Sequence, residues 1–140
     1  MAGRVTRFGV SISPELLAGL DRLVRKRGYP NRSHAIRDLI RARMVEEEWA
    51  SGQGEVAGTV TIVYDHHQSD VGRTLNQLQH SYRELIVSTL HVHLDERHCL
   101  EVVVVRGRPG QAREVADRLC SAKGVKHGRL VATSTGRELA

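Results

Sequence analysis

The chain of 140 residues is poor in aromatic side chains, which make up 4% of the sequence, and it holds two cysteines, Cys99 and Cys120. With so few aromatic rings, recognition of single strands by base stacking is poorly supported. Two cysteines do not make a disulfide framework in a chain of this size, so we expect a reducing, cytoplasmic compartment. No stretch approaches roughly 18 consecutive apolar residues and none resembles a signal peptide, which predicts no membrane partner.

Catalytic patterns are also absent from the sequence. No Ser/His/Asp order, phosphate-binding glycine loop or pair of carboxylates stands out. A catalytic metal would need an open coordination position and a base beside it, and Glu101 is the one candidate for that base. We therefore expect that the protein is not an enzyme.

Positive charge is concentrated in the first third of the chain. Residues 1–43 hold ten Lys or Arg against three Asp or Glu, whereas residues 44–140 hold eleven against thirteen. Seven of the eight histidines and both cysteines lie in the second part. This segregation predicts a nucleic-acid-binding module joined to a part that carries metal-ligand residue types.

Residues 1–48 have the pattern of one strand followed by two helices. Apolar and polar residues alternate over 7–12, which predicts a short half-buried strand. Ser13 and Pro14 form a helix start, Gly28 ends that helix, and Asn31 can cap a second one. So small a unit buries little core, and its strand has two unpaired edges. Both problems are solved if two copies pair their strands as the ribbon of a ribbon-helix-helix domain, which enters the DNA major groove.

On the predicted strand, Arg7, Gly9 and Ser11 share the face that would meet the base edges of double-stranded DNA. Arg can form two hydrogen bonds to a guanine edge, Ser can bond several bases, and a glycine permits close approach. Arg32 and Ser33 begin the second helix, where free amides and the helix dipole favour a phosphate. The alternatives are a solvated amphipathic strand and an ordinary helix cap.

The remainder of the chain is predicted to form a second domain. Residues 46–54 have low apolar content and two glycines, which predicts a fraying helix end and a linker over 49–56. Residues 57–136 form the domain that follows. Its strands are predicted at 56–64, 85–94, 99–105 and 125–132, and its helices at 70–82 and 111–120. This order is that of a ferredoxin-like βαββαβ domain, so the expected fold class of the chain is α+β.

Two histidines and a cysteine in the predicted hairpin of this domain form an incomplete metal site. His91 and His93 share one face of a strand, and a turn over 95–97 can bring Cys99 opposite them. His80, near the end of the preceding helix, is a candidate fourth ligand from the same chain or from another. Such a ligand set suits tetrahedral Zn(II) or square-planar Ni(II) or Cu(II), and spacing alone does not decide among them.

These residue types also have plainer interpretations. A lone histidine on a strand is usually at the surface or hydrogen-bonded, and a lone buried cysteine is usually inert. We interpret the other histidines of the second part as solvated: His66, His67, His98 and His127. Cys120 lies on the apolar side of a predicted helix, so we expect it in the core.

Three segments together resemble the nickel-responsive transcriptional regulators of the NikR family. They are residues 7–12, residues 31–38 with their Asn-Arg-Ser and Ala-Ile-Arg-Asp runs, and residues 89–101 with their Leu-His-Val-His and Cys-Leu-Glu runs. The resemblance spans about residues 4 to 132. It implies a homotetramer, in which two DNA-binding dimers flank four ferredoxin-like (ACT-type) domains. It also implies a repressor of nickel uptake that binds operator DNA when Ni(II) is bound.

Carried over residue by residue, the resemblance implies one Ni(2+) per subunit in square-planar coordination. The ligands would be His91, His93 and Cys99 of one subunit and His80 of a neighbouring subunit. Glu101 matches an acidic position beside the ligands, where it could orient one of them. Two alternatives remain: a regulator of the same architecture that senses zinc, copper or a small molecule, and a metal storage or delivery protein with an incidental basic arm.

The DNA-binding part matches the family at some positions and departs from it at others. Arg7 and Ser11 match strand positions that read DNA. Gly9 stands where some members carry a threonine, so the operator sequence is not carried over. Some members carry a glutamate at the position of His34, as part of a cation site between the domains. Asp38 matches a residue of that site, but His34 does not.

Overall fold

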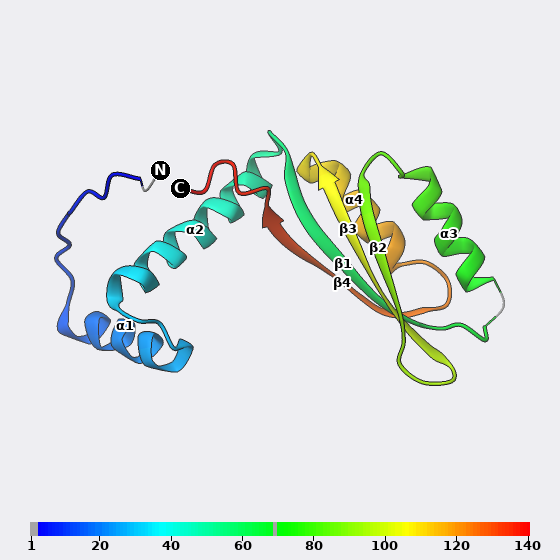
Figure 1. The fold of residues 1–140 in the computed structure, drawn as a ribbon, viewed down its shortest axis with the longest axis horizontal. Coiled ribbons are helices and arrows are strands. Elements are labelled where there is room, and N and C mark those ends of the chain that lie inside the picture. Colours follow the sequence, from blue (N-terminus) through cyan, green and yellow to red (C-terminus); the bar gives the residue numbers. More distant parts are fainter. Residues whose placement is uncertain (1–2, 69) are drawn as a thin grey trace. The chain divides into compact units, whose positions relative to one another are not determined.

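A computed structural model describes residues 3–68 and 70–140 of the chain. The chain divides into two compact units, residues 1–42 and residues 43–140. Two helices come first, and four strands and two further helices follow in the order β1, α3, β2, β3, α4, β4 (Figure 1). Among the residues described, no helix combines the length and the apolar character that a membrane crossing requires.

Helix α1, Pro14–Arg27, has both of the ends that the sequence predicts. The hydroxyl of Ser13 accepts a hydrogen bond from the backbone N–H of Leu16 at 3.2 Å. Gly28 follows the last turn with φ of 71° in the left-handed region, where a glycine carries no penalty for a Cβ. Local capping chemistry is therefore sufficient to place this helix.

Helix α2, Arg32–Ser51, begins where Asn31 was predicted to cap it, because the Asn31 side chain accepts from the His34 backbone N–H at 2.8 Å. The helix end that was predicted within residues 46–54 lies at Ser51, so the helix reaches into the first residues of the predicted linker. Trp49 is 3% exposed, lies in the core of the second unit, and donates from its indole nitrogen to the carbonyl of Thr133 at 2.7 Å. The packing of one large side chain orders a segment whose composition is mostly polar.

The described residues before α1 form no strand, although the alternation over 7–12 predicts one. Their apolar face is open, with Phe8 71%, Val10 65% and Ile12 40% exposed. A strand needs a partner for its backbone N–H and C=O groups, and a single chain holds no second copy of this segment. Among the described residues of the first unit, Ala35 alone is fully buried. This unit therefore has almost no core within one chain.

The second unit is built on one antiparallel sheet with the strand order β2-β3-β1-β4 (Figure 1). This is the predicted ferredoxin-like arrangement, and the α+β fold class is confirmed. The predicted elements lie within a few residues of the observed ones, which are β1 Val56–Asp65, α3 Val71–Ser81, β2 Ile86–His93, β3 His98–Gly107, α4 Pro109–Cys120 and β4 Val125–Ser134.

One face of the sheet and the two helices α3 and α4 share the core. Alternate residues of β1 and β3 are buried, among them Ile62 and Val103. They pack with Leu75 of α3 and with Val115 and Leu119 of α4. The alternate apolar residues of the strands pack against the apolar faces of the helices in this layer. Gln79 of α3 is hydrogen-bonded to Thr89 of β2 and Glu101 of β3, which places the two strands of the candidate site beside this helix.

The burial of Trp49 gives a test of this packing. We expect Trp49→Ala to lower the free energy of unfolding by about 3–5 kcal/mol, as for other buried large-to-small changes. Trp49→Phe keeps an aromatic ring but leaves the Thr133 carbonyl without its donor, which should cost about 1–3 kcal/mol. Urea unfolding followed by circular dichroism measures both. Equal stabilities of wild type and Trp49→Ala would contradict the assignment of this side chain to the core.

Candidate metal centre

The hairpin of β2 and β3 brings the predicted ligands opposite one another. In the antiparallel register His93 lies opposite Cys99 and His91 opposite Glu101. The turn between the strands is held by the Asp95 carboxylate, which accepts from the backbone N–H groups of Arg97 and His98, both at 2.8 Å. Asp is common in such turns because its side chain bonds the backbone two or three residues on. The predicted hairpin is therefore formed, with both imidazoles and the thiol on one face.

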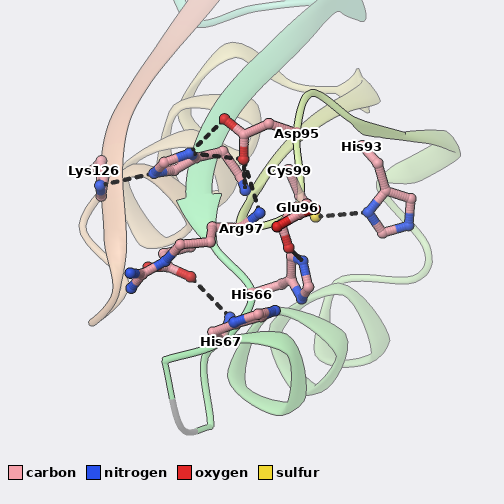
Figure 2. A network of polar contacts seen from close by, with 10 residues as sticks. His66, His67, His93, Asp95, Glu96, Arg97, Cys99 and Lys126 are labelled. Carbon is pink, nitrogen blue, oxygen red and sulfur yellow. Dashed lines mark hydrogen bonds and ion pairs between the residues drawn. The ribbon is translucent and has the colours of Figure 1, made fainter.

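A third histidine joins His93 and Cys99 in a compact cluster. His66, from the loop after β1, offers a ring nitrogen that lies, together with a His93 nitrogen and the Cys99 Sγ, within 4.8 Å of the others. The Cys99 Sγ is 3.4 Å from the His93 Nδ1 (Figure 2). The centroids of the His66 and His93 rings are 5.6 Å apart. Three nitrogen and sulfur donors at this separation can hold one metal ion.

His91 lies beside this cluster, two residues before His93 on the same face of β2. The centroid of its ring is 5.0 Å from that of His93, and its Nδ1 is 3.8 Å from the Glu101 Oε1. Tyr64 of β1 meets the His91 ring edge to face, with 6.2 Å between centroids. The two imidazoles of β2 are thus adjacent, and that of His91 lies near the Glu101 carboxylate.

Glu101 is 5% exposed and ties the ligand strands to α3. Its Oε1 accepts from the side-chain amide of Gln79 at 3.5 Å, and the Gln79 carbonyl oxygen accepts from the Thr89 hydroxyl at 2.7 Å. Its Oε2 is buried without a hydrogen-bond partner among the described residues. Burial raises the pKa of the Tyr64 hydroxyl, and the Glu101 carboxylate raises that pKa further. A buried carboxylate beside imidazoles and a thiol favours a cation in the site.

Cys99 is fully buried, and the loss of solvation raises the pKa of its thiol, with the Glu101 charge as a further cause. In the metal-free chain the thiol is therefore protonated near neutral pH. A divalent metal reverses this preference, because a coordinating thiol is deprotonated. Imidazoles and a thiolate are ligands for Zn(II), Ni(II) and Cu(II), so the residues present fit such an ion.

The fourth predicted ligand lies apart from the cluster of its own chain. His80 is exposed in the last turn of α3 and is outside the group of donors that the described residues bring together. His98 is engaged with Asp95 and with Lys126, whose Nζ is 3.0 Å from the His98 Nε2. His67 and His127 are exposed, while Cys120 is partly buried against the core.

His66 is exposed, as expected for a solvated side chain, but its place beside His93 and Cys99 was not predicted from the sequence. The signal was the register of β1 against β3, in which Asp65 pairs with His98 and Tyr64 with Cys99. A residue directly after Asp65 must emerge beside the β2–β3 turn. This pairing joins residues about thirty positions apart, and no local pattern encodes it.

The predicted DNA-contacting residues are accessible in the first unit. Arg7, Gly9 and Ser11 are exposed in the segment before α1. The Arg32 guanidinium forms two hydrogen bonds with the carboxylate of Asp21, at 2.8 and 2.9 Å. A phosphate at the start of α2 would therefore be met by backbone N–H groups there, rather than by a free Arg32 side chain.

Comparisons with known proteins agree with this architecture. The model of the NikR C-terminal nickel-binding domain matches residues 57–133, and that of the copG-type ribbon-helix-helix proteins matches residues 6–47. The chain belongs to the nickel-responsive regulator family. This is a family of transcription regulators rather than enzymes, and the part of the chain that holds the cluster is its nickel-binding domain.

Several relatives of the chain carry names that describe them as nickel-responsive regulators. One from Thermococcus onnurineus is 59% identical over 97% of this chain and 99% of its own length. A relative from Geobacter metallireducens is 54% identical over 98% of this chain and 99% of its own length. An uncharacterized protein of Thermotoga maritima has the same fold over 56% of this chain and 98% of its own, with a TM-score of 0.50 and 19% identity.

The burial of Cys99 predicts its reactivity in the metal-free regulator. We expect iodoacetamide to modify Cys99 more slowly than the partly exposed Cys120 at pH 8. Burial raises the pKa of both thiols and keeps both in the unreactive form to higher pH, so the slower reaction of Cys99 is expected from its complete burial. Peptide mass spectrometry over time measures both sites. Faster labelling of Cys99 in the folded chain would contradict its burial.

Proposed function

We propose that this regulator represses nickel-uptake genes by binding operator DNA when Ni(II) occupies its metal site. The observation that carries the proposal is one chain that joins a ribbon-helix-helix domain to a nickel-binding domain with imidazoles and a thiol clustered on one hairpin. The basic charge of the first part supports DNA as the partner, and the imidazole and thiol donors of the second support a divalent transition metal such as Ni(II). A protein that reads DNA and keeps Cys99 as a free thiol belongs in the cytoplasm.

The proposed metal site takes ligands from two subunits. His91, His93 and Cys99 of one subunit and His80 of a neighbour hold one Ni(II) per subunit. The exposed position of His80 supports a role outside its own chain. A bound Ni(II) would supply the positive charge that balances the Cys99 thiolate and the buried Glu101 carboxylate, and Glu101 would orient His91.

The proposed assembly is a dimer of dimers. The first unit exposes Phe8 and Val10 in a single chain, and a second copy of the strand would cover them. The sheet face away from α3 and α4 exposes Leu90 to 60%, Val92 to 37% and Val131 to 54%. Apolar surface in two separate parts of the chain suits two distinct contacts between copies, as a homotetramer requires.

DNA contacts are assigned to the first unit. Arg7, Gly9 and Ser11 would face base edges when two copies pair as a ribbon in the major groove. The backbone amides of Arg32 and Ser33 would hold a phosphate at the start of α2. Pairing of two copies determines which face of the segment meets DNA, because the apolar face turns inward.

The switch follows from a metal that bridges two chains. Such a metal stabilises only the arrangement in which both chains place their ligands correctly. Its effect on DNA affinity cannot exceed its preference for the DNA-competent arrangement over the others. His80, at the end of α3, would be ordered by joining the ligands of a neighbouring subunit, and this ordering would favour the DNA-competent arrangement.

Metal dependence of DNA binding tests the whole proposal. A duplex is first selected from a random library with the Ni(II)-loaded protein, and its affinity is then measured at fixed salt with Ni(II), Zn(II), Cu(II) or a chelator. We expect Ni(II) to tighten binding by about 5- to 150-fold over the chelated protein, the usual range of coupling between two sites. Equal affinities with Ni(II) and with chelator would exclude nickel control. A response confined to Zn(II) or Cu(II) would favour a sensor of that metal, and no selected duplex would favour storage or delivery.

Variants with single substitutions separate the ligand sets. We expect His80→Ala, His91→Ala and Cys99→Ser each to lose the charge-transfer absorption of square-planar Ni(II), and His66→Ala to keep it. A mixture of His80→Ala and Cys99→Ser chains should regain part of the absorption, because hybrid assemblies contain complete inter-subunit sites. Loss of the signal in His66→Ala, with retention in His80→Ala, would place the nickel in the cluster within one chain instead.

The role of the first unit is tested at Arg7. We expect Arg7→Ala to weaken binding of the selected duplex by about tenfold, since a good contact of this kind is worth about 1–3 kcal/mol. Arg73→Ala is the matched control, because it removes the same charge from a side chain of α3 that is 76% exposed. Nickel affinity should be unchanged in both variants. Equal loss of DNA affinity in the two would show a general charge effect rather than base reading.

A further inference from the structure

An ion pair ties the turn of the ligand hairpin to the end of the central strand β1. Asp65, the last residue of β1, is 2% exposed. Its Oδ2 accepts from both the Nη2 and the Nε of Arg97, at 2.6 and 3.1 Å, and Arg97 lies in the turn between β2 and β3. The Arg97 side chain is 62% exposed, so the carboxylate is the buried partner of the pair.

The same two residues hold a third segment, the loop that begins at His66. The Oδ1 of Asp65 accepts from the backbone N–H of His67 at 2.9 Å. The carbonyl of Arg97 accepts from the backbone N–H of His66 at 2.9 Å. Figure 2 shows His66 near Cys99, with His67 next to it and the Arg97 side chain on the side away from His93. The pair therefore joins the end of β1, the His66 loop and the ligand hairpin.

The turn that the pair holds is flanked on both sides by metal ligands. His93 ends β2, and Cys99 is the second residue of β3. The 3.4 Å between the His93 Nδ1 and the Cys99 Sγ depends on how tightly this turn closes. A turn with freedom to open would separate the two donors, and metal binding would then have to order it. Donors that are already in place bind at a lower conformational cost.

We propose that Asp65 and Arg97 are positioning residues that preorganise His93 and Cys99 for metal, although neither is proposed to touch it. This inference rests on the proposed function for the identity of the metal, whereas its geometry comes from the contacts of Asp65 and Arg97 described above. Removal of the guanidinium leaves a buried carboxylate without its charged partner, which is costly and favours opening of the turn. The effect reaches the metal through the backbone of the hairpin.

The chain supplies a matched control at the other end of the same two strands. Arg106 of β3 pairs with Glu55, next to the start of β1, at 2.7 and 2.8 Å. The antiparallel register places Asp65 opposite His98 and Val56 opposite Gly107, so the two ion pairs lie at opposite ends of the β1–β3 ladder. Arg97→Gln and Arg106→Gln therefore make the same chemical change at the site end and at the remote end.

The first measurement is Ni(II) affinity of the full chain by competition with a chelator. We expect Arg97→Gln to weaken binding by about tenfold or more, the scale found when groups that orient metal ligands are removed. Arg106→Gln should bind as the wild type does. The Ni(II) affinity of Arg97→Lys should lie between those of Arg97→Gln and the wild type, because lysine keeps the positive charge but lacks the two-pronged geometry of the guanidinium. Asp65→Asn should weaken binding as Arg97→Gln does, and circular dichroism of each variant would show that the affinities compare folded chains.

The second measurement uses the metal-free chain and does not depend on nickel. Hydrogen exchange at the amides of His66 and Leu94, which bond to the carbonyls of Arg97 and His98, should be faster in Arg97→Gln than in Arg106→Gln. Equal exchange and equal nickel affinity in the two variants would overturn the inference. If the wild type itself binds no nickel through Cys99, the proposed function fails, and the exchange rates alone then decide whether the pair holds the hairpin.

Discussion

The antiparallel register between β2 and β3 is the constraint on which the candidate metal centre depends. Side chains alternate between the faces of a sheet, so a slip of one residue would turn His93 away from Cys99. The Asp95 turn holds one end of this pairing, and β1 holds β3 along its other edge. Imidazoles and thiol are therefore brought together by backbone pairing in a core-supported sheet. A site on a loop would have to be ordered by the metal itself.

In a single chain, the strand-like segment before α1 has no strand to pair with, and His80 lies apart from the other proposed ligands. The segment before α1 has the alternation of a strand and no strand to pair with, and the first unit has almost no core. His80 is exposed at the end of α3, away from the cluster. In the proposed regulator, association of chains would therefore both bury the exposed apolar surface and complete the metal site.

Elements governed by local chemistry could be predicted from sequence. The hydroxyl of Ser13 and the left-handed Gly28 bound α1 through contacts within a few residues, and the apolar period of each strand and helix of the second unit is visible along the chain. Trp49 and His66 could not be placed in this way. One is buried because it reaches β4, and the other joins the cluster because β1 pairs with β3. Both contacts connect positions far apart in the sequence.

The sequence by itself determined the order of elements, the segregation of basic residues from metal-ligand types, and the pairing of His91 and His93 on one strand face. Only the tertiary structure decided which groups surround that pair: the buried Glu101 beside His91, His66 next to Cys99, and the Asp65–Arg97 ion pair behind the turn. The physical reason is that periodicity and capping act over a few residues. Strand register and burial depend on the whole sheet and its helices.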